Sequence, residues 1–169
     1  MTLEATLEGS GPDLTEGYAS EPRPLKGYAL LGSLFGAGFA GFVIAAHRRG
    51  RMPERIEARD LVLLGIATHK ISRLAAKEMV TSFVRAPFTR FEEETGKGEV
   101  SERSRGQGLR RATGELLTCP CCVGQWVAAG LTAGLVSAPR TTRMVTGMYT
   151  ALTVSDFLQI GYKAAEERA

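Results

Sequence analysis

Residues of the kinds that bind zinc are scarce in this chain of 169 residues. It holds three cysteines and two histidines, and the histidines, His47 and His69, lie far from the cysteines in the sequence. A structural zinc ion needs about four protein ligands. The composition therefore argues against a complete zinc site within one chain, and no set of residues forms a recognisable active site. We expect no cofactor.

Several patterns that identify soluble folds are also missing. We find no internal repeat, no heptad pattern and no apolar alternation typical of strands, which leaves an all-α protein as the expected fold class. Proteins that bind nucleic acids usually carry a clustered basic patch with aromatic residues or a known motif. The aromatic residues of the basic central segment are only Phe83, Phe88 and Phe91. We therefore expect no nucleic-acid partner.

Long apolar runs are present instead, and the clearest is the uncharged stretch of 20 residues at 27–46. At about 1.5 Å per residue, such a helix crosses a hydrocarbon core of about 30 Å. A cleaved signal peptide would begin with a short basic region and end at a small-residue cleavage site. This run follows an acidic tail, and the basic cluster His47-Arg48-Arg49-Gly50-Arg51 comes after it. The pattern predicts a retained transmembrane helix.

Two more apolar runs lie near the C-terminus. Residues 119–138 are uncharged, and residues 144–162 contain a single charge, Asp156. Five residues separate the runs, which suits a tight connection between antiparallel helices. The sequence predicts a transmembrane hairpin at 119–162, followed by a C-terminal tail at 163–169. The alternative is a pair of buried helices in a soluble core, but the apolar character on all sides argues against it.

A fourth helix is predicted at about residues 59–80, and it is amphipathic. Lys70, Arg73 and Lys77 are spaced three and four residues apart, so they share one face. A transmembrane position would bury three cations at several kcal/mol each. We expect this helix to lie in the membrane interface, with its basic face toward anionic headgroups. A true span at 60–79 stays open as an alternative.

The distribution of charge predicts the topology. Residues 47–118 hold 15 of the 21 lysines and arginines, whereas residues 1–26 hold two against five acids. The positive-inside rule places the central segment in the cytoplasm, with the N-terminus outside and, after three crossings, the C-terminus inside. If residues 60–79 spanned the membrane, the segment 80–118 would lie outside. Residues 1–26 are predicted to be disordered, and residues 91–108 to form a mobile loop.

The motif Cys119-Pro120-Cys121-Cys122 opens the second apolar run and gives Cys119 and Cys122 the C-x-x-C spacing. A helix N-terminus favours a thiolate, which is the species that disulfide exchange requires. The same pair could instead hold a metal shared between chains. A third interpretation is that the cysteines are reduced packing residues, because cytoplasmic thiols stay reduced.

Asp156 is the one acid within a predicted span. Gln125 and Asp156 lie at similar distances from Thr141, the centre of the predicted turn, so antiparallel helices would place them at nearly the same depth. The sequence predicts a Gln125–Asp156 hydrogen bond, with a proton- or ion-handling carboxylate as the alternative. Small-residue stripes at Gly32-x-x-x-Gly36 and Gly130-x-x-x-Gly134 indicate helix contacts within the chain or in a homo-oligomer.

Three segments carry a resemblance to a known family. Residues 67–74, ATHKISRL, look like an AT-x-R-x-T/S-R-L helix, and residues 85–88, RAPF, look like an R-x-P-F element. Residues 108–128 contain the most distinctive block, similar to G-x-G-E-L-L-x-C-P-x-C-x-G-x-W. These segments resemble the domain of unknown function 1360 family of small bacterial membrane proteins, some of which are labelled sporulation proteins. Lys70 and Cys121 depart from the residues usual in the family.

The resemblance covers roughly Asp60 to the C-terminus and implies a helical protein of the bacterial inner membrane, without an established activity. The function expected from the sequence is a membrane anchor or docking partner for another protein, without catalysis. The first alternative is a thiol-redox or metal-binding protein that uses Cys119 and Cys122. A weaker alternative is a small transporter that uses Asp156.

Overall fold

The computed structural model describes residues 18–96 and 98–168 and is mostly helical in these ranges. Much of the predicted disordered tail falls on residues 1–17, outside the described residues. The elements in chain order are α1 (Leu25–Arg48), α2 (Ala58–Lys77), a 3-10 turn η2 (Met79–Thr81), α3 (Ser82–Arg85), β1 (Thr89–Gly96), β2 (Glu99–Ser104), α4 (Gly108–Thr118), α5 (Pro120–Ser137) and α6 (Pro139–Glu166). The predicted tail at 163–169 is wrong in part, because α6 continues to Glu166.

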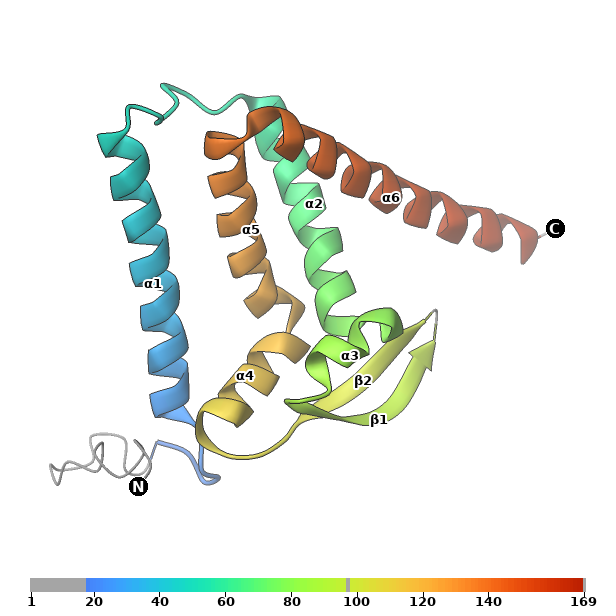
Figure 1. Cartoon of the computed structure of the whole chain (residues 1–169). Helices are drawn as coiled ribbons and strands as arrows, with labels where there is room; N and C mark the ends of the chain where they lie inside the picture. The colour runs from blue at the N-terminus through green and yellow to red at the C-terminus, as the bar shows by residue number, and fades with distance from the viewer. Residues whose placement is uncertain (1–17, 97, 169) are drawn as a thin grey trace, which may run out of the picture.

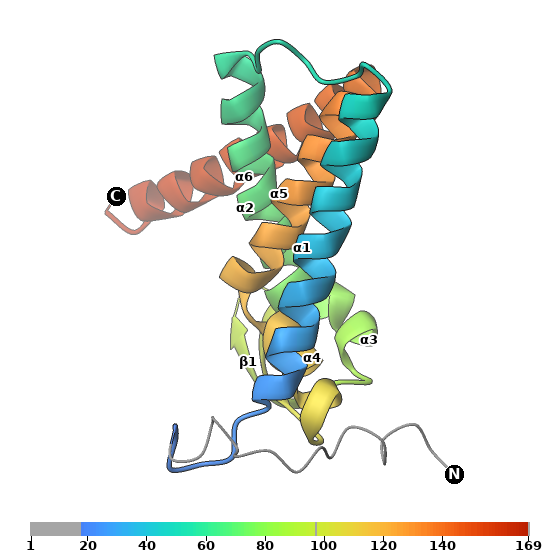
Figure 2. The same ribbon diagram turned by 90° about the vertical axis from the view of Figure 1, so that its left-hand side faces the viewer.

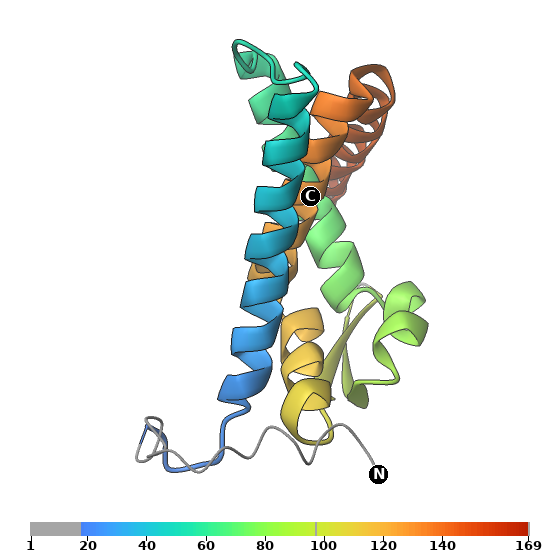
Figure 3. The same ribbon diagram turned by 60° about the vertical axis from the view of Figure 1, so that its left-hand side comes forward.

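Three long helices, α1, α2 and α5, stand side by side (Figure 1). The helix α2 packs against both α5 and α6, and α6 leaves the bundle obliquely (Figure 2). At one end of the bundle lie η2, α3, β1, β2 and α4, which we call the hairpin subdomain (residues 79–118). Figure 3 shows α4 of this subdomain beside the beginning of α1.

Among the described residues, two helices are long and apolar enough to cross a membrane. They are α1, with a mean hydropathy of 2.0, and α5, with 1.2. They match the predicted spans at 27–46 and 119–138 to within two residues at each end. The third predicted span, 144–162, forms the middle of α6, which is not one of these two helices. Side chains of α1 and α5 meet in an edge-to-face contact between Phe35 and Trp126, whose ring centres are 5.1 Å apart.

The connection between α5 and α6 differs from the predicted five-residue turn. Only Ala138 separates the two helices, and Pro139 begins α6. Proline is well suited to the first helical position, since its missing N–H has no partner there and its φ is already helical. Thr142 therefore sits on the first turn of α6, and its hydroxyl oxygen would lie 2.7 Å from a Cβ placed at Gly134. Beyond this close approach, α6 runs along α2 more than along α5.

The helix α2 packs against other helices of the bundle, whereas its basic face predicts a helix that lies in the membrane interface. Its small residues Ala67 and Ala76 are buried, and α5 and α6 pack against it. In Figure 1 its axis follows those of α1 and α5. Its apolar face thus contacts protein, and α2 lies alongside the two apolar helices.

The predicted mobile loop at 91–108 is wrong for most of its length, and the fold is not purely α. Residues 89–104 form an antiparallel hairpin, with Thr89 opposite Ser104 and Phe91 opposite Glu102. Gly96 and Gly98 have positive φ angles of 89° and 76°, which glycine adopts easily in a turn. The strands are hard to recognise in the sequence because every residue of β1 after Thr89 is exposed.

The beginning of α1 and the hairpin subdomain lie at the same end of the molecule. Arg111 Nη1 donates a hydrogen bond to the carbonyl of Pro22 at 3.0 Å, and the Tyr28 hydroxyl donates to the Glu115 carboxylate. The predicted topology placed residues 1–26 and 91–108 on opposite sides of a membrane. These contacts contradict that placement, because α2 returns the chain to the end where α1 begins.

Close contact between α1 and α4 depends on Gly27. A Cβ at this position would lie 2.7 Å from the Cβ of Ala112 and 3.3 Å from the Cα of Leu109. We expect Gly27→Ala to lower the free energy of unfolding by about 1–3 kcal/mol, because backbone has to move to make room. Chemical denaturation of the protein in a mild detergent measures this change.

Gly32→Ala is the matched control on the same helix, since no atom lies within 4 Å of its Cβ position. Alanine is the better helix former, so this variant should be as stable as the wild type or slightly more stable. Equal stability of the Gly27 and Gly32 variants would contradict the packing of α1 on α4.

Candidate functional site

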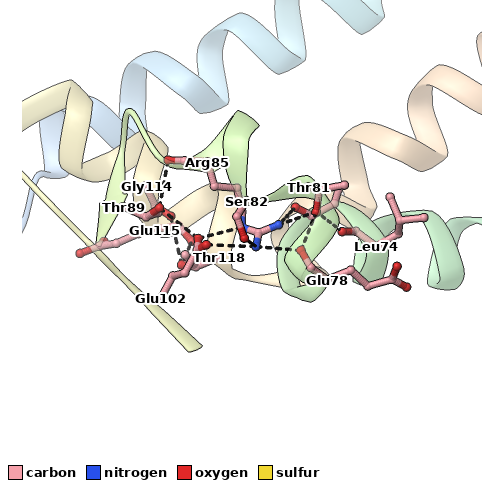
Figure 4. A network of polar contacts seen from close by, with 11 residues as sticks. Leu74, Glu78, Thr81, Ser82, Arg85, Thr89, Glu102, Gly114, Glu115 and Thr118 are labelled. Carbon is pink, nitrogen blue, oxygen red and sulfur yellow. Dashed lines mark hydrogen bonds and ion pairs between the residues drawn. The ribbon is translucent and has the colours of Figure 1, made fainter. Parts of the chain in front are cut away.

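A buried arginine holds the hairpin subdomain to the end of α2. Arg85 Nε donates to Glu102 Oε2 at 2.8 Å, and Nη2 donates to Oε1 at 3.1 Å. Nη1 donates to the carbonyl of Ala75 at 2.7 Å and to the Thr81 hydroxyl at 2.6 Å, while Nη2 also reaches the carbonyl of Glu78 at 3.1 Å. Figure 4 shows how the guanidinium lies between these groups. The arginine side chain is fully buried, and its charge is matched by a carboxylate that is 5% exposed.

Glu102 stays charged within this network. Burial by itself raises the pKa of its carboxyl group, but hydrogen bonds from Arg85 and Thr89 outweigh that effect and hold the pKa below its ordinary value. The helix α4 completes the surroundings, since a Cβ at Gly114 would lie 2.5 Å from the carbonyl oxygen of Phe88. Arg85 belongs to the RAPF element of the sequence, but nothing in the sequence near either residue marks Glu102 as its partner.

The three cysteines lie where α4 ends and α5 begins, at the same end of the bundle. Cys119 has an extended backbone and forms the N-cap of α5, and its Sγ accepts a hydrogen bond from the backbone N–H of Cys122 at 3.4 Å. The Sγ atoms of Cys119 and Cys122 are 2.8 Å apart. All three cysteines are free thiols, and Cys121 and Cys122 are exposed.

Cys119 precedes the apolar helix, and its surroundings favour the thiolate. Hydrogen bonds from the Cys122 thiol and from the amides of Cys122 and Cys121 lower the pKa of Cys119, against an opposing effect of burial. The ammonium of Lys77 adds a smaller attraction. In the described part of the chain, no three histidine, cysteine or acidic side chains group closely enough to hold a metal ion. The arrangement thus suits nucleophilic thiol chemistry.

A groove of about 710 Å³ lies between α2, α6 and the tip of the hairpin. Lys70 Nζ lies there 2.9 Å from Glu78 Oε1 and 3.0 Å from Asp156 Oδ2. Arg73 forms an ion pair with Glu99. Two of the three cations of the predicted basic face are therefore paired with acids of the chain itself, and the third, Lys77, lies near Cys119. The membrane-surface role of this face stays a prediction.

The predicted Gln125–Asp156 pair is not present. Asp156 is paired with Lys70 of α2, whereas Gln125 is exposed on α5. The prediction assumed a five-residue turn and two antiparallel helices in contact along their lengths. Because Ala138 alone joins them and α6 packs along α2, Asp156 reaches a partner that lies 86 positions earlier in the sequence.

A second ion pair between α2 and α6 lies at the opposite end of the bundle. Arg143 Nη2 is 2.7 Å from Asp60 Oδ2, and Arg143 Nε is 3.0 Å from Oδ1. The carboxylate of Asp60 is nearly buried. The apolar pattern predicts a loop at Arg143 and gives no sign of this pair, since nothing local links two residues 83 positions apart.

Comparison with known proteins identifies a family. Residues 63–162 match the family described as "Protein of unknown function (DUF1360)". This stretch is more than half of the chain, and it includes the Arg85 network, the cysteines and the Lys70–Asp156 pair. It excludes α1. No curated protein and no solved structure matches the chain.

Removal of the buried arginine should release the hairpin subdomain. We expect Arg85→Met to destabilise the protein by about 3–5 kcal/mol, because the Glu102 carboxylate then stays buried without its partner. Hydrogen exchange should show faster exchange of the β2 amides, and denaturation in detergent measures the total loss.

Arg90→Met on the exposed face of β1 is the matched control and should change stability by less than about 0.5 kcal/mol. The double variant Arg85→Met with Glu102→Met should recover part of the loss, because no charge is left buried. If Arg85→Met exchanges as slowly as the control, the network does not hold the subdomain.

Proposed function

The chain belongs to the DUF1360 family of proteins of unknown function, and we propose that it is a multi-pass membrane protein whose hairpin subdomain is a docking surface for a protein partner. The apolar helices provide the anchor. The free edge of β1 provides the docking surface. The Arg85 network joins the two parts.

The exposure of α1 and α5 supports the membrane location. Only 6% of the most apolar 18-residue window of each helix is buried inside the chain. In a soluble protein the apolar face of a helix is covered by other elements. With 24 and 18 residues, the two helices are about 36 Å and 27 Å long, which suits a hydrocarbon core of about 30 Å.

Two further helices accompany them in this proposal. The helix α2 crosses beside α5, with Lys70 and Arg73 paired to acids in the groove. The helix α6 contains the third predicted span and makes the fourth crossing, with exposed apolar side chains that include Met144, Met148, Leu152, Phe157 and Leu158. The family resemblance favours a bacterial inner membrane.

Charge in the short connection between α1 and α2 supports an orientation. The short connection between α1 and α2, residues 49–57, carries Arg49, Arg51 and Arg55, and Arg143 lies at the same end. Short basic connections stay in the cytoplasm. The N-terminus, the hairpin subdomain and the C-terminus are then outside, which differs from the three-crossing prediction for both the hairpin subdomain and the C-terminus.

Labelling from outside intact cells tests this topology. In a variant without native cysteines, single cysteines replace Ser20, Met52, Glu94 or Arg168. We expect an impermeant maleimide to label positions 20, 94 and 168 in intact cells, and position 52 only after the membrane is permeabilised. Labelling of position 52 in intact cells, or protection of position 94, would contradict the proposed topology.

The β1 edge is the observation that carries the docking role. Among the described residues β1 pairs with β2 alone, so the backbone groups of its other edge are free. Seven of its eight residues are exposed, including the acidic run Glu92, Glu93 and Glu94. A free strand edge accepts an extended peptide through main-chain hydrogen bonds. The three carboxylates favour a partner whose extended segment is basic.

Rigid attachment makes this edge a better docking surface. The opposite strand, β2, holds Glu102 in the Arg85 network, and a backbone bridge joins Glu78 to Glu99. The strand is thus positioned before a partner arrives, which reduces the entropy lost on binding. The ion pairs that tie α6 to α2 give the transporter alternative no support, since Asp156 already has a partner.

Peptide binding tests the docking surface. The purified protein in detergent should bind a fluorescent peptide of alternating lysine and valine, as measured by anisotropy. We expect Glu92→Lys with Glu93→Lys and Glu94→Lys to weaken binding at least tenfold. The reversal of Glu54 and Glu57, at the other end of the molecule, is the control and should have little effect.

A second peptide separates strand addition from plain charge attraction. It has the same lysines but proline in place of every valine, so its alternate main-chain N–H groups are missing. We expect this peptide to bind at least tenfold more weakly. Equal binding of the two peptides, or equal binding to the triple variant and the wild type, would contradict docking at the β1 edge.

A further inference from the structure

The cysteine pair before α5 carries chemistry that docking does not use. We propose that Cys119 and Cys122 form a redox-active dithiol that exchanges with disulfide bonds, with Cys119 as the nucleophile and Cys122 as the resolving thiol. The substrate class is a disulfide, either in a protein or in a small thiol compound. The proposal does not depend on the docking role or on the membrane orientation.

The distance between the two sulfurs allows a disulfide to form. They are 2.8 Å apart, close to the bond length of about 2.05 Å in a disulfide, so small side-chain rotations suffice to join them. Pro120 fixes the helix start between them, and the three-residue spacing places both cysteines on one side of the first turn. The pair can close without movement of the helices.

The surroundings of the Cys119 sulfur indicate that this thiol attacks first. Cys119 is the N-cap of an 18-residue helix, and its sulfur already accepts the Cys122 amide N–H at 3.4 Å. This donor, the Cys122 thiol and the nearby Lys77 ammonium all stabilise a negative charge on the Cys119 sulfur. Exchange requires the thiolate, so Cys119 is the natural nucleophile.

The exposure of Cys122 suits it to the role of the resolving thiol. Cys122 is exposed, so a mixed disulfide on Cys119 leaves the resolving thiol free to attack. Cys121 is exposed as well, but it lies two residues after Cys119, which places it on a different side of the helix from Cys119. It therefore serves as the matched control for the other two cysteines.

The proposed reaction consists of two thiol–disulfide exchange steps. The Cys119 thiolate attacks one sulfur of the substrate disulfide, a Cys119–substrate disulfide forms, and the second substrate sulfur leaves as a thiolate that takes a proton. Cys122 then loses its proton and attacks the Cys119 sulfur, which releases the first substrate sulfur as a thiol. The substrate gains two electrons, and the Cys119–Cys122 pair loses two. An added dithiol reductant restores the pair for the next cycle.

Reduction assays with the full chain in detergent test the proposal. The substrates are insulin and a self-quenched fluorescent glutathione disulfide, and dithiothreitol is the reductant. We expect the wild type and Cys121→Ser to accelerate reduction of at least one substrate. Cys119→Ser and Cys122→Ser should each lose at least tenfold of the enzyme-dependent rate. Acceleration of insulin reduction alone assigns protein disulfides, and acceleration of the glutathione substrate alone assigns small ones.

Trapping gives a readout that does not depend on turnover. With glutathione disulfide, Cys122→Ser should accumulate one glutathione on Cys119, as seen by intact mass and peptide mapping, whereas the wild type should instead lose two hydrogen atoms. Thermal unfolding equal to that of Cys121→Ser shows that each variant is folded. Full activity of Cys119→Ser, or no adduct on a folded Cys122→Ser protein, would overturn the proposal.

Discussion

The buried ion pair between Arg85 and Glu102 is the interaction on which the rest of the structure depends. The last carbonyl groups of a helix have no partner within that helix. Arg85 satisfies the carbonyl of Ala75 in the last turn of α2 and that of Glu78 just beyond it, and it binds the Glu102 carboxylate of β2 with the same guanidinium. One side chain thus ends a long helix and fixes the strand that follows.

The Arg85 network positions the hairpin of β1 and β2, and the elements that pack on the hairpin follow. The strand β2 holds β1, whose other edge is free, and α4 packs closely on both the hairpin and α1. The short step from α4 to α5 places Cys119 at the start of an apolar helix. The proposed docking edge and the proposed dithiol therefore lie at the same end of the bundle, although each is tested by itself (Figure 1).

Two ion pairs, at different positions along α2, hold α6 against that helix. Arg143 meets Asp60 near the beginning of both helices, and Asp156 meets Lys70 farther along. Charges that look unfavourable in an apolar helix are in this way matched across the α2–α6 contact. Two of the basic residues of α2 have further acidic partners within the chain, since Lys70 also meets Glu78 and Arg73 meets Glu99.

Features that depend on local composition can be recognised from the sequence alone. The apolar runs at 27–46 and 119–138 became α1 and α5 almost to the residue, and the motif at 108–128 indicated the correct family. Helix formation and apolarity are properties of neighbouring residues, so a single stretch of chain is sufficient to reveal them.

Contacts between distant parts of the chain fix the hairpin of β1 and β2, the central position of α2 and the partner of Asp156. The strands of the hairpin are polar and are fixed by contacts with Arg85 and α4 rather than by their own pattern. The position of α2 follows from acids that lie 8 to 86 residues from its lysine and arginine side chains. Pairing between distant charges leaves no periodic signal in the sequence, because it depends on which helices the fold brings together.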